Sequence, residues 1–180
     1  MKTFLFSLVT ILTLTSKAQV TKVTLQASGL TCSMCTKAVH NALNEVSFVE
    51  KVQVDIKNQQ YNITFKEGTA IEFDALQKAV DDAGFGVAGF TVTAKLDNVK
   101  LGKDEHVKIG DQYFHFLNGM NRQLNGLTTF TVVDKTFTTA KNFRKYSGLS
   151  KMQCVQTGRT ATCCSSEHIP EQSRIYHTII

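Results

Sequence analysis

Proline is almost absent from this chain of 180 residues. The single proline, Pro170, lies near the C-terminal end. Thioredoxin-like thiol-disulfide oxidoreductases place a cis-proline against their two active-site thiols. The chain offers no proline near its two N-terminal cysteines, Cys32 and Cys35, and this argues against that class of enzyme.

Long apolar runs are equally scarce. One reaches from Phe4 to Leu14, follows Lys2 and precedes Ser16-Lys17-Ala18, which fits a small-x-small cleavage site. This combination is typical of a secretory signal peptide. The run is shorter than the roughly 20 residues that a spanning helix needs, and no later run is long enough. We therefore expect residues 1–18 to be removed, leaving a secreted or periplasmic protein with no membrane span. The alternative is an uncleaved N-terminal anchor.

Basic charge is modest once that segment is removed. Loss of Lys2 and Lys17 lowers the formal net charge from +5 to +3. Residues 19–95 then carry −1 and residues 96–180 carry +4. Neither half shows a stripe of basic residues interleaved with aromatic ones, the pattern of nucleic-acid-binding surfaces. We expect no nucleic-acid partner.

Cysteine is present in an odd number, five, so at least one cannot lie in an intramolecular bridge. Two of them stand in the run Thr31-Cys32-Ser33-Met34-Cys35, between a strand-like pattern and a strongly amphipathic helical one. A helix start has free N–H groups and the positive end of the helix dipole, and both favour thiolate over thiol. Thiolates at this spacing indicate a site for a soft metal ion.

The pattern around this loop predicts strand, helix, strand, strand, helix, strand. Apolar and polar residues alternate in all four expected strands, within 22–28, 51–57, 61–66 and 90–94. The first helix carries its apolar residues at helical spacing, and the second ends at Gly84. The apolar positions of the first helix are Cys35, Ala38, Val39, Ala42, Leu43 and Val46. This order predicts a ferredoxin-like βαββαβ domain of the α+β class, with both helices on one sheet face.

The same residues resemble the heavy-metal-associated domain family. The likeness covers about residues 21–94 and rests on the order of elements, the Thr-Cys-x-x-Cys loop and Ala83-Gly84-Phe85. Members include copper chaperones, N-terminal modules of metal-pumping ATPases and periplasmic mercury carriers. The resemblance implies that Cys32 and Cys35 are the metal ligands and that Phe85 packs near them. Leu30 stands where the family usually has Met, at a core position where Leu should serve nearly as well.

Two thiolates with no acid or histidine in the loop favour a low coordination number. We rank Cu(I) first and Hg(II) second, because Zn(II) normally has four ligands and would need Met34, water or a second molecule. His40 is expected on the solvent side of the helix. The implied role is metal binding and transfer by thiolate exchange with a donor or acceptor protein, without enzymatic turnover. The alternatives are a structural disulfide, a thiol-disulfide oxidoreductase, and an interaction protein whose second domain carries the function.

The second half, residues 96–180, resembles no family that we can name. Short strands are expected at 99–101, 106–109, 112–117, 127–133 and 136–138. With glycine between them, they predict a small, mainly β domain, with an OB-like barrel as one form. We thus expect a signal peptide at 1–18, a metal-binding domain at 19–95 and this second domain.

The C-terminal tail holds the remaining cysteines, Cys154, Cys163 and Cys164. Cys154 paired with either neighbour would form a stabilising bridge of the kind that small exported domains use. Alternatively, the adjacent thiols form a second soft-metal site, with His168 as a further ligand. The spacing of these residues matches no standard zinc pattern. The sequence therefore leaves both the disulfide and the second metal site possible.

Overall fold

The computed structural model describes residues 18–167 and 169–180. The expected signal peptide, apart from Ala18, and the candidate ligand His168 lie outside these residues. Within them, no helix is both long enough and apolar enough to cross a membrane.

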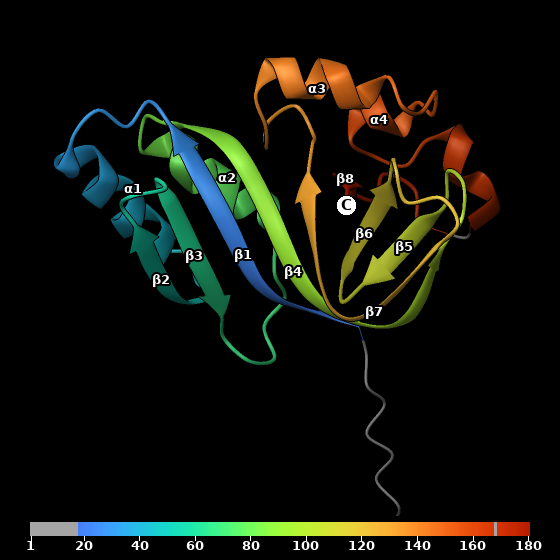
Figure 1. The fold of residues 1–180 in the computed structure, drawn as a ribbon, viewed down its shortest axis with the longest axis horizontal. Helices are drawn as coiled ribbons and strands as arrows, with labels where there is room; N and C mark the ends of the chain where they lie inside the picture. Colours follow the sequence, from blue (N-terminus) through green and yellow to red (C-terminus); the bar gives the residue numbers. More distant parts are fainter. Residues whose placement is uncertain (1–17, 168) are drawn as a thin grey trace, which may run out of the picture.

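The first half has the predicted βαββαβ order (Figure 1). Its elements are β1 (Gln19–Ser28), α1 (Ser33–Asn44), β2 (Val49–Asp55), β3 (Gln60–Phe65), α2 (Phe73–Asp82) and β4 (Gly86–Leu101). The strands lie in the order β2-β3-β1-β4, and every neighbouring pair is antiparallel. This is the ferredoxin-like arrangement that the sequence predicts.

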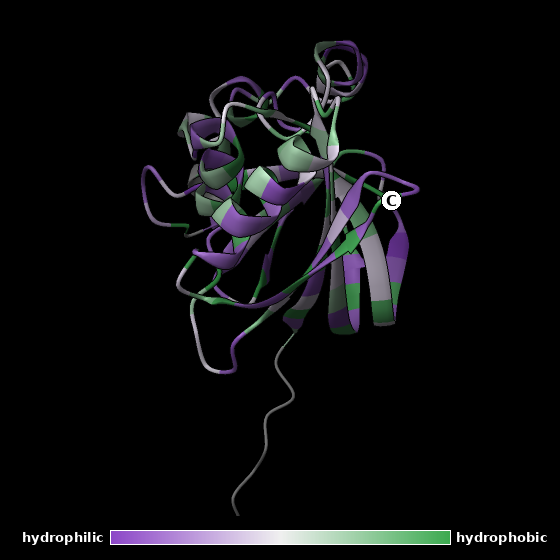
Figure 2. Cartoon of the chain, turned by 90° about the vertical axis from the view of Figure 1, so that its left-hand side faces the viewer, coloured by the Kyte–Doolittle hydropathy of each residue, from purple (hydrophilic) through white to green (hydrophobic). Residues whose placement is uncertain are grey.

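The core of this half follows from the period of its apolar residues. Alternation along the strands, visible as alternating colours in Figure 2, turns Val23 and Leu25 of β1 inward, and both are fully buried. The helices contribute residues at helical spacing, also fully buried: Val39 and Leu43 from α1, and Phe73, Leu76 and Val80 from α2. Burying each large apolar side chain stabilises the fold by roughly 2 kcal/mol.

The second half continues the same sheet. β4 is 16 residues long and pairs with β1 on one side and with β7 (Arg122–Val132) on the other. Beyond β7 come β8 (Ile175–Ile179), β6 (Gln112–Phe116) and β5 (His106–Ile109), which complete an eight-stranded sheet. β6 and β8 run parallel, whereas β5 and β6 are antiparallel. The remaining elements are α3 (Ala140–Ser147), α4 (Cys154–Thr157) and the 3-10 helix η1 (Thr162–Glu167).

The separate OB-like barrel expected for residues 96–180 is not confirmed, because these strands extend the first sheet. The boundary expected at residue 95 falls inside β4, whose pairing with β7 continues past it to Leu101. One core serves both halves: the Phe73 ring of α2 lies 5.1 Å from Phe90, 6.0 Å from Phe114 and 5.0 Å from Tyr176. The strands predicted at 106–109 and 112–117 are confirmed, but residues 136–138 form a turn instead of a strand.

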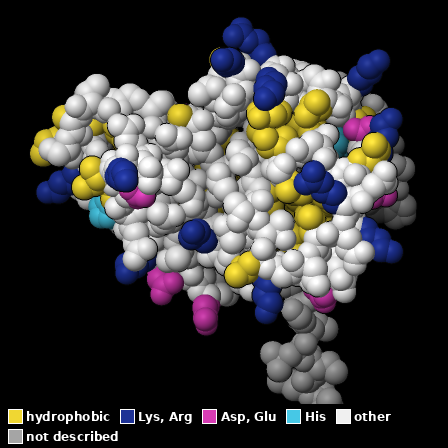
Figure 3. All heavy atoms as spheres, viewed as in Figure 1, with side chains coloured by type: hydrophobic (Ala, Val, Ile, Leu, Met, Phe, Trp, Pro, Cys, Tyr) yellow, Lys and Arg dark blue, Asp and Glu magenta, His cyan; other side chains and the backbone are white. Residues whose placement is uncertain are grey.

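Charged residues are dispersed over the face that Figure 3 shows. Some Lys and Arg side chains stand at the top, where α3 carries Lys141, Arg144 and Lys145, and the others are spread over the rest of the face. This face therefore carries no continuous basic stripe.

Candidate metal centre

The loop between β1 and α1 sets the position of the two N-terminal thiols. Gly29 turns the chain with a φ of +85°, a conformation that favours glycine. Cys32 is the N-cap of α1, in extended conformation, and its Sγ accepts a hydrogen bond of 3.4 Å from the Cys35 N–H. A cap oxygen usually fills this role. A cysteine here holds its sulfur over the positive end of α1, whose first turn carries no acidic residue.

The two sulfurs lie side by side near the surface. The Sγ atoms of Cys32 and Cys35 are 2.9 Å apart, well beyond the bond length of about 2.05 Å in a disulfide, and both residues are free thiols. Cys32 is exposed and Cys35 is half-buried. A zinc–sulfur bond is about 2.3 Å long, so the two sulfurs are close enough for a single ion to contact both.

The surroundings of Cys35 favour its thiolate. The hydrogen bond with the Cys32 thiol, followed by that from the Thr31 backbone, lowers the pKa of Cys35 below its ordinary value. Tyr61 lies fully buried beneath the start of α1 and donates its hydroxyl to the Thr36 carbonyl at 3.2 Å. Burial raises the pKa of Tyr61, so it remains a neutral donor.

Neighbouring side chains support the loop from below. Leu30 is half-buried and packs against the core, consistent with the structural role expected for it. Phe85 is also half-buried, and its ring lies 3.7 Å from the point where a Cβ on Gly29 would stand. A Cβ at position 29 would thus only touch Phe85, and the cost of a substitution there comes from the positive φ of the turn.

The loop and α1 carry two other potential ligands, Met34 and His40. Met34 is 70% exposed, and His40 is turned toward the Asn44 side chain and the Val52 carbonyl, which lies 3.3 Å from its Nε2. Within residues 18–167 and 169–180, neither cluster of three or more potential metal ligands includes Cys32 or Cys35. The centre therefore offers two cysteine sulfurs and an open approach, which suits a soft cation of low coordination number.

The tail cysteines are brought together elsewhere in the molecule. Cys154 begins α4 and Cys163 and Cys164 lie in η1, and all three are free thiols. The structure adds His106 from β5, whose Nε2 lies 3.7 Å from the Cys154 Sγ. His106 could not be predicted from the sequence, because it precedes Cys154 by 48 residues and stands in no local pattern with it.

Comparison with known proteins finds relatives of the part of the chain that holds this centre. The family description "Heavy-metal-associated domain" matches residues 24–86, which include both cysteines of the centre. The mercuric transport protein periplasmic component of Pseudomonas aeruginosa is 41% identical over 64 residues, covering 35% of this chain and 68% of that protein. A probable copper-exporting P-type ATPase of Archaeoglobus fulgidus is 33% identical over 64 residues, covering 36% of this chain and 8% of the ATPase.

Among solved structures, the crystal structure of oxidized MerP from Ralstonia metallidurans CH34 aligns with 35% identity and a TM-score of 0.35. The alignment covers 38% of this chain and 94% of that one. The chain belongs to the heavy-metal-associated domain family, as the sequence predicts. It spans 8% of the copper ATPase and 68% of the mercuric transport protein, and the matches fall in its N-terminal half.

Proposed function

We propose that this protein binds Cu(I) through Cys32 and Cys35 and passes it to other proteins by thiolate exchange. The observation that carries the proposal is the pair of adjacent free thiols at the exposed start of α1. Soft thiolate ligands select soft ions, and two ligands without a neighbouring carboxylate or imidazole favour Cu(I) over Zn(II).

The location of the centre supports transfer. α1 lies at one end of the long axis of the molecule, and Cys32 stands on the loop that leads into it (Figure 1). A thiolate of a second protein can therefore add to a bound ion before Cys32 or Cys35 leaves. Such an exchange releases no free metal and needs no enzymatic turnover.

Hg(II) is a second candidate ion. Like Cu(I), it is a soft cation that two thiolates can hold. It is supported by the 41% identity with the mercuric transport protein. Cu(I) and Hg(II) would bind to the same two ligands, so only a competition between the two ions shows which one the protein prefers.

Anaerobic titration of the reduced mature chain with Cu(I), against a competing Cu(I) chelator, tests the binding. We expect the number of tightly bound equivalents to fall by one in the Cys32→Ser/Cys35→Ser variant. The matched control is Met34→Leu, which removes an exposed thioether from the same loop and should leave the affinity unchanged. Parallel titration with Hg(II) ranks the two ions. If neither ion is bound tightly, the proposal fails. The better hypotheses are then a thiol-disulfide oxidoreductase and an interaction protein.

Transfer is tested by mixing two copies of the protein. A Cu(I)-loaded, unlabelled copy is added to a metal-free, ¹⁵N-labelled copy in the presence of chelator, and amide signals around residues 32–36 are followed by NMR. We expect the labelled copy to acquire metal faster than the chelator removes it from a loaded copy alone. Equal rates would mean that the ion dissociates first, which contradicts direct exchange.

Export is part of the same proposal and rests on the sequence of residues 1–18. Expression of the full chain in a bacterium, followed by fractionation and N-terminal sequencing, should give a periplasmic product that begins at Gln19. A product retained with Met1 at the membrane would favour the N-terminal anchor instead.

A further inference from the structure

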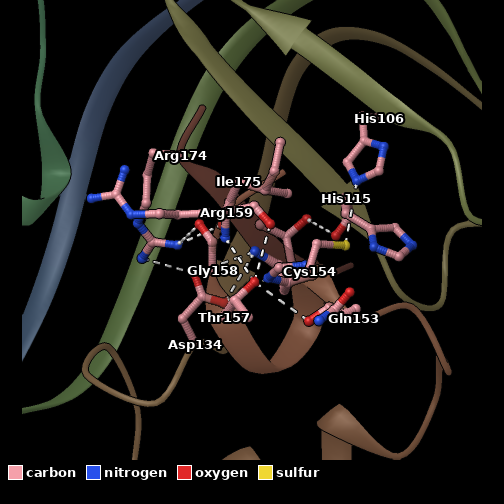
Figure 4. A network of polar contacts seen from close by, with 12 residues as sticks. His106, His115, Asp134, Gln153, Cys154, Thr157, Gly158, Arg159, Arg174 and Ile175 are labelled. Carbon is pink, nitrogen blue, oxygen red and sulfur yellow. Dashed lines mark hydrogen bonds and ion pairs between the residues drawn. The ribbon is translucent and has the colours of Figure 1, made fainter. Parts of the chain in front are cut away.

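Three thiols and an imidazole converge at the far end of the sheet from Cys32. The Sγ atoms of Cys154, Cys163 and Cys164 all lie within 4.8 Å of one another, and those of Cys163 and Cys164 are 3.4 Å apart. His106 directs its Nε2 at this group, 3.7 Å from the Cys154 Sγ and 3.8 Å from the Cys164 Sγ. Figure 4 shows Cys154 facing the ring of His106, with His115 alongside.

The orientation of His106 is fixed by a carboxylate. Glu167, at the end of η1, contacts the His106 Nδ1 at 2.7 Å and accepts the His106 backbone N–H at 3.1 Å. The His106 side chain is fully buried. A carboxylate on one ring nitrogen leaves the other free to bind a metal, and this carboxylate–histidine arrangement is common around protein-bound zinc.

Three of the distances within this group fit a tetrahedral site. Zinc bonds of about 2.3 Å to sulfur and 2.0–2.1 Å to nitrogen place neighbouring ligand atoms roughly 3.6–3.8 Å apart. The two N···S distances and the Cys163–Cys164 distance lie close to this range. The ligands are therefore gathered before any ion binds.

Burial is a further indication. Cys154 and Cys164 are buried in a small cluster with Val155, separate from the main core. The buried ring of His115 lies 5.1 Å from that of His106 and helps to enclose the group.

We propose that Cys154, Cys163, Cys164 and His106 form a second, four-coordinate metal site that takes Zn(II). Three thiolates and one imidazole form a closed set of the kind found in structural zinc sites, unlike the open pair at Cys32 and Cys35. The site ties α4 and η1 to β5. α4 and η1 are short and share a small core, so metal binding would contribute folding free energy to this region.

Binding is tested in the reduced mature chain with Cys32→Ser/Cys35→Ser, which removes the first centre. Co(II) serves as a spectroscopic probe, followed by its displacement with Zn(II). We expect one equivalent of Co(II) with the intense visible bands of a tetrahedral thiolate complex, and these should be lost after the further change Cys164→Ser. The same parent carrying His40→Asn is the control for a histidine outside the site and should keep the bands.

A variant that keeps all four ligands tests the role assigned to Glu167. Glu167→Gln keeps the size of the side chain but weakens its hold on His106, so we expect Zn(II) affinity to fall about 10–100-fold. Glu171→Gln, at an exposed position, should leave the affinity unchanged. An unchanged affinity in Glu167→Gln would contradict the assigned orientation of His106.

The coordination can be decided without changing any ligand. X-ray absorption spectroscopy of the zinc-loaded Cys32→Ser/Cys35→Ser chain should show three sulfur ligands and one nitrogen ligand, even if the ligand variants fail to fold. Failure to bind Zn(II), a shell dominated by oxygen, or a disulfide among the tail cysteines in freshly isolated protein would each overturn the proposal. The last is read by mass spectrometry after alkylation without reductant.

Discussion

At the scale of single residues, Cys32 has two tasks. Its sulfur caps the first turn of α1 through the Cys35 N–H, and it also shares a hydrogen bond with the Cys35 thiol. The second contact is the largest of the effects that lower the pKa of Cys35. The acidity of one ligand therefore depends on the presence of the other.

The pH dependence of Cys35 alkylation should reveal this coupling in the metal-free protein. A lowered pKa keeps Cys35 as thiolate to a lower pH, so its alkylation rate should level off below the pH typical of a free cysteine. Cys32→Ala removes the thiol hydrogen bond and should move the midpoint of the profile upward. Rates are read by mass spectrometry of the peptide containing residue 35, with Met34→Ala as control. An unmoved midpoint in Cys32→Ala would contradict the coupling.

At the scale of elements, Arg174 links β8 to α2 and to the turn after β7. Its guanidinium contacts Asp74 of α2 at 2.9 Å and Asp134 at 3.1 Å, and it lies over the Tyr176 ring at 4.3 Å. Asp134 is buried and also contacts the Nδ1 of His177 at 2.7 Å. Burial by itself would lower the pKa of Arg174, but the two carboxylates raise it overall, so the residue stays charged.

Replacement of this arginine should destabilise the protein strongly. Arg174→Leu leaves the buried Asp134 without its cationic partner, and breaking a buried pair in this way costs about 3–5 kcal/mol. Chemical denaturation measures the free energy of unfolding. Arg159→Leu, an exposed arginine in the same region, is the control and should change it by less than about 1 kcal/mol. Similar losses in both variants would show that the Asp134 contact is not the cause.

The turn between β2 and β3 gives a second test at this scale. The Asn58 side chain and backbone donate to Asp55 at 2.8 and 3.1 Å and lower the pKa of that exposed carboxyl. Because the pKa is lower in the folded state, this contribution to stability is present above the unfolded pKa and is lost as pH falls through the folded one. We expect Asn58→Ala to raise the pKa of Asp55 in an NMR titration, with Asn62→Ala as control. No change would rule out the side-chain hydrogen bond as the main cause.

The elements of the first half could be predicted because each is defined by local periodicity. The same holds for Cys32 and Cys35, which lie in one short motif. The extension of β4 could not be predicted, because its pairing with β7 shifts register between Leu96 and Val99, and that interruption resembles a domain boundary in the sequence. The adjacent tail thiols were predicted as one possible metal site, but the place of His106 beside them was not, since it depends on β5 and η1 meeting across residues far apart in the chain.

At the scale of the whole molecule, β4 makes the two halves one structural unit. It pairs with β1 and β7 along the same residues, Phe90 to Ala94, and the aromatic core crosses between the halves. An isolated 19–95 segment would leave one side of this strand unpaired and Phe73 without Tyr176. The metal-binding domain is therefore expected to be stable only with the rest of the chain.

Unfolding should accordingly occur in a single transition. Two variants that create a cavity test this, Val39→Ala in the first half and Phe130→Ala in the second. Each should lower the melting temperature of the whole molecule. Calorimetry of the metal-free protein, together with backbone NMR near the midpoint, measures this. Two separated transitions, each moved by one of the variants, would show that the halves unfold independently.

The two ends of the sheet also differ from its interior. β2 and β5 are the edge strands, β2 carries exposed Glu50 and Lys51 beside an irregularity in its pairing, and β5 is only four residues long. Charges, bulges and short length at an edge oppose strand addition by other copies, the usual route to aggregation. Concentrated solutions of the metal-free protein should therefore stay monodisperse. Any association that appears on adding metal can then be attributed to sulfur ligands shared between molecules.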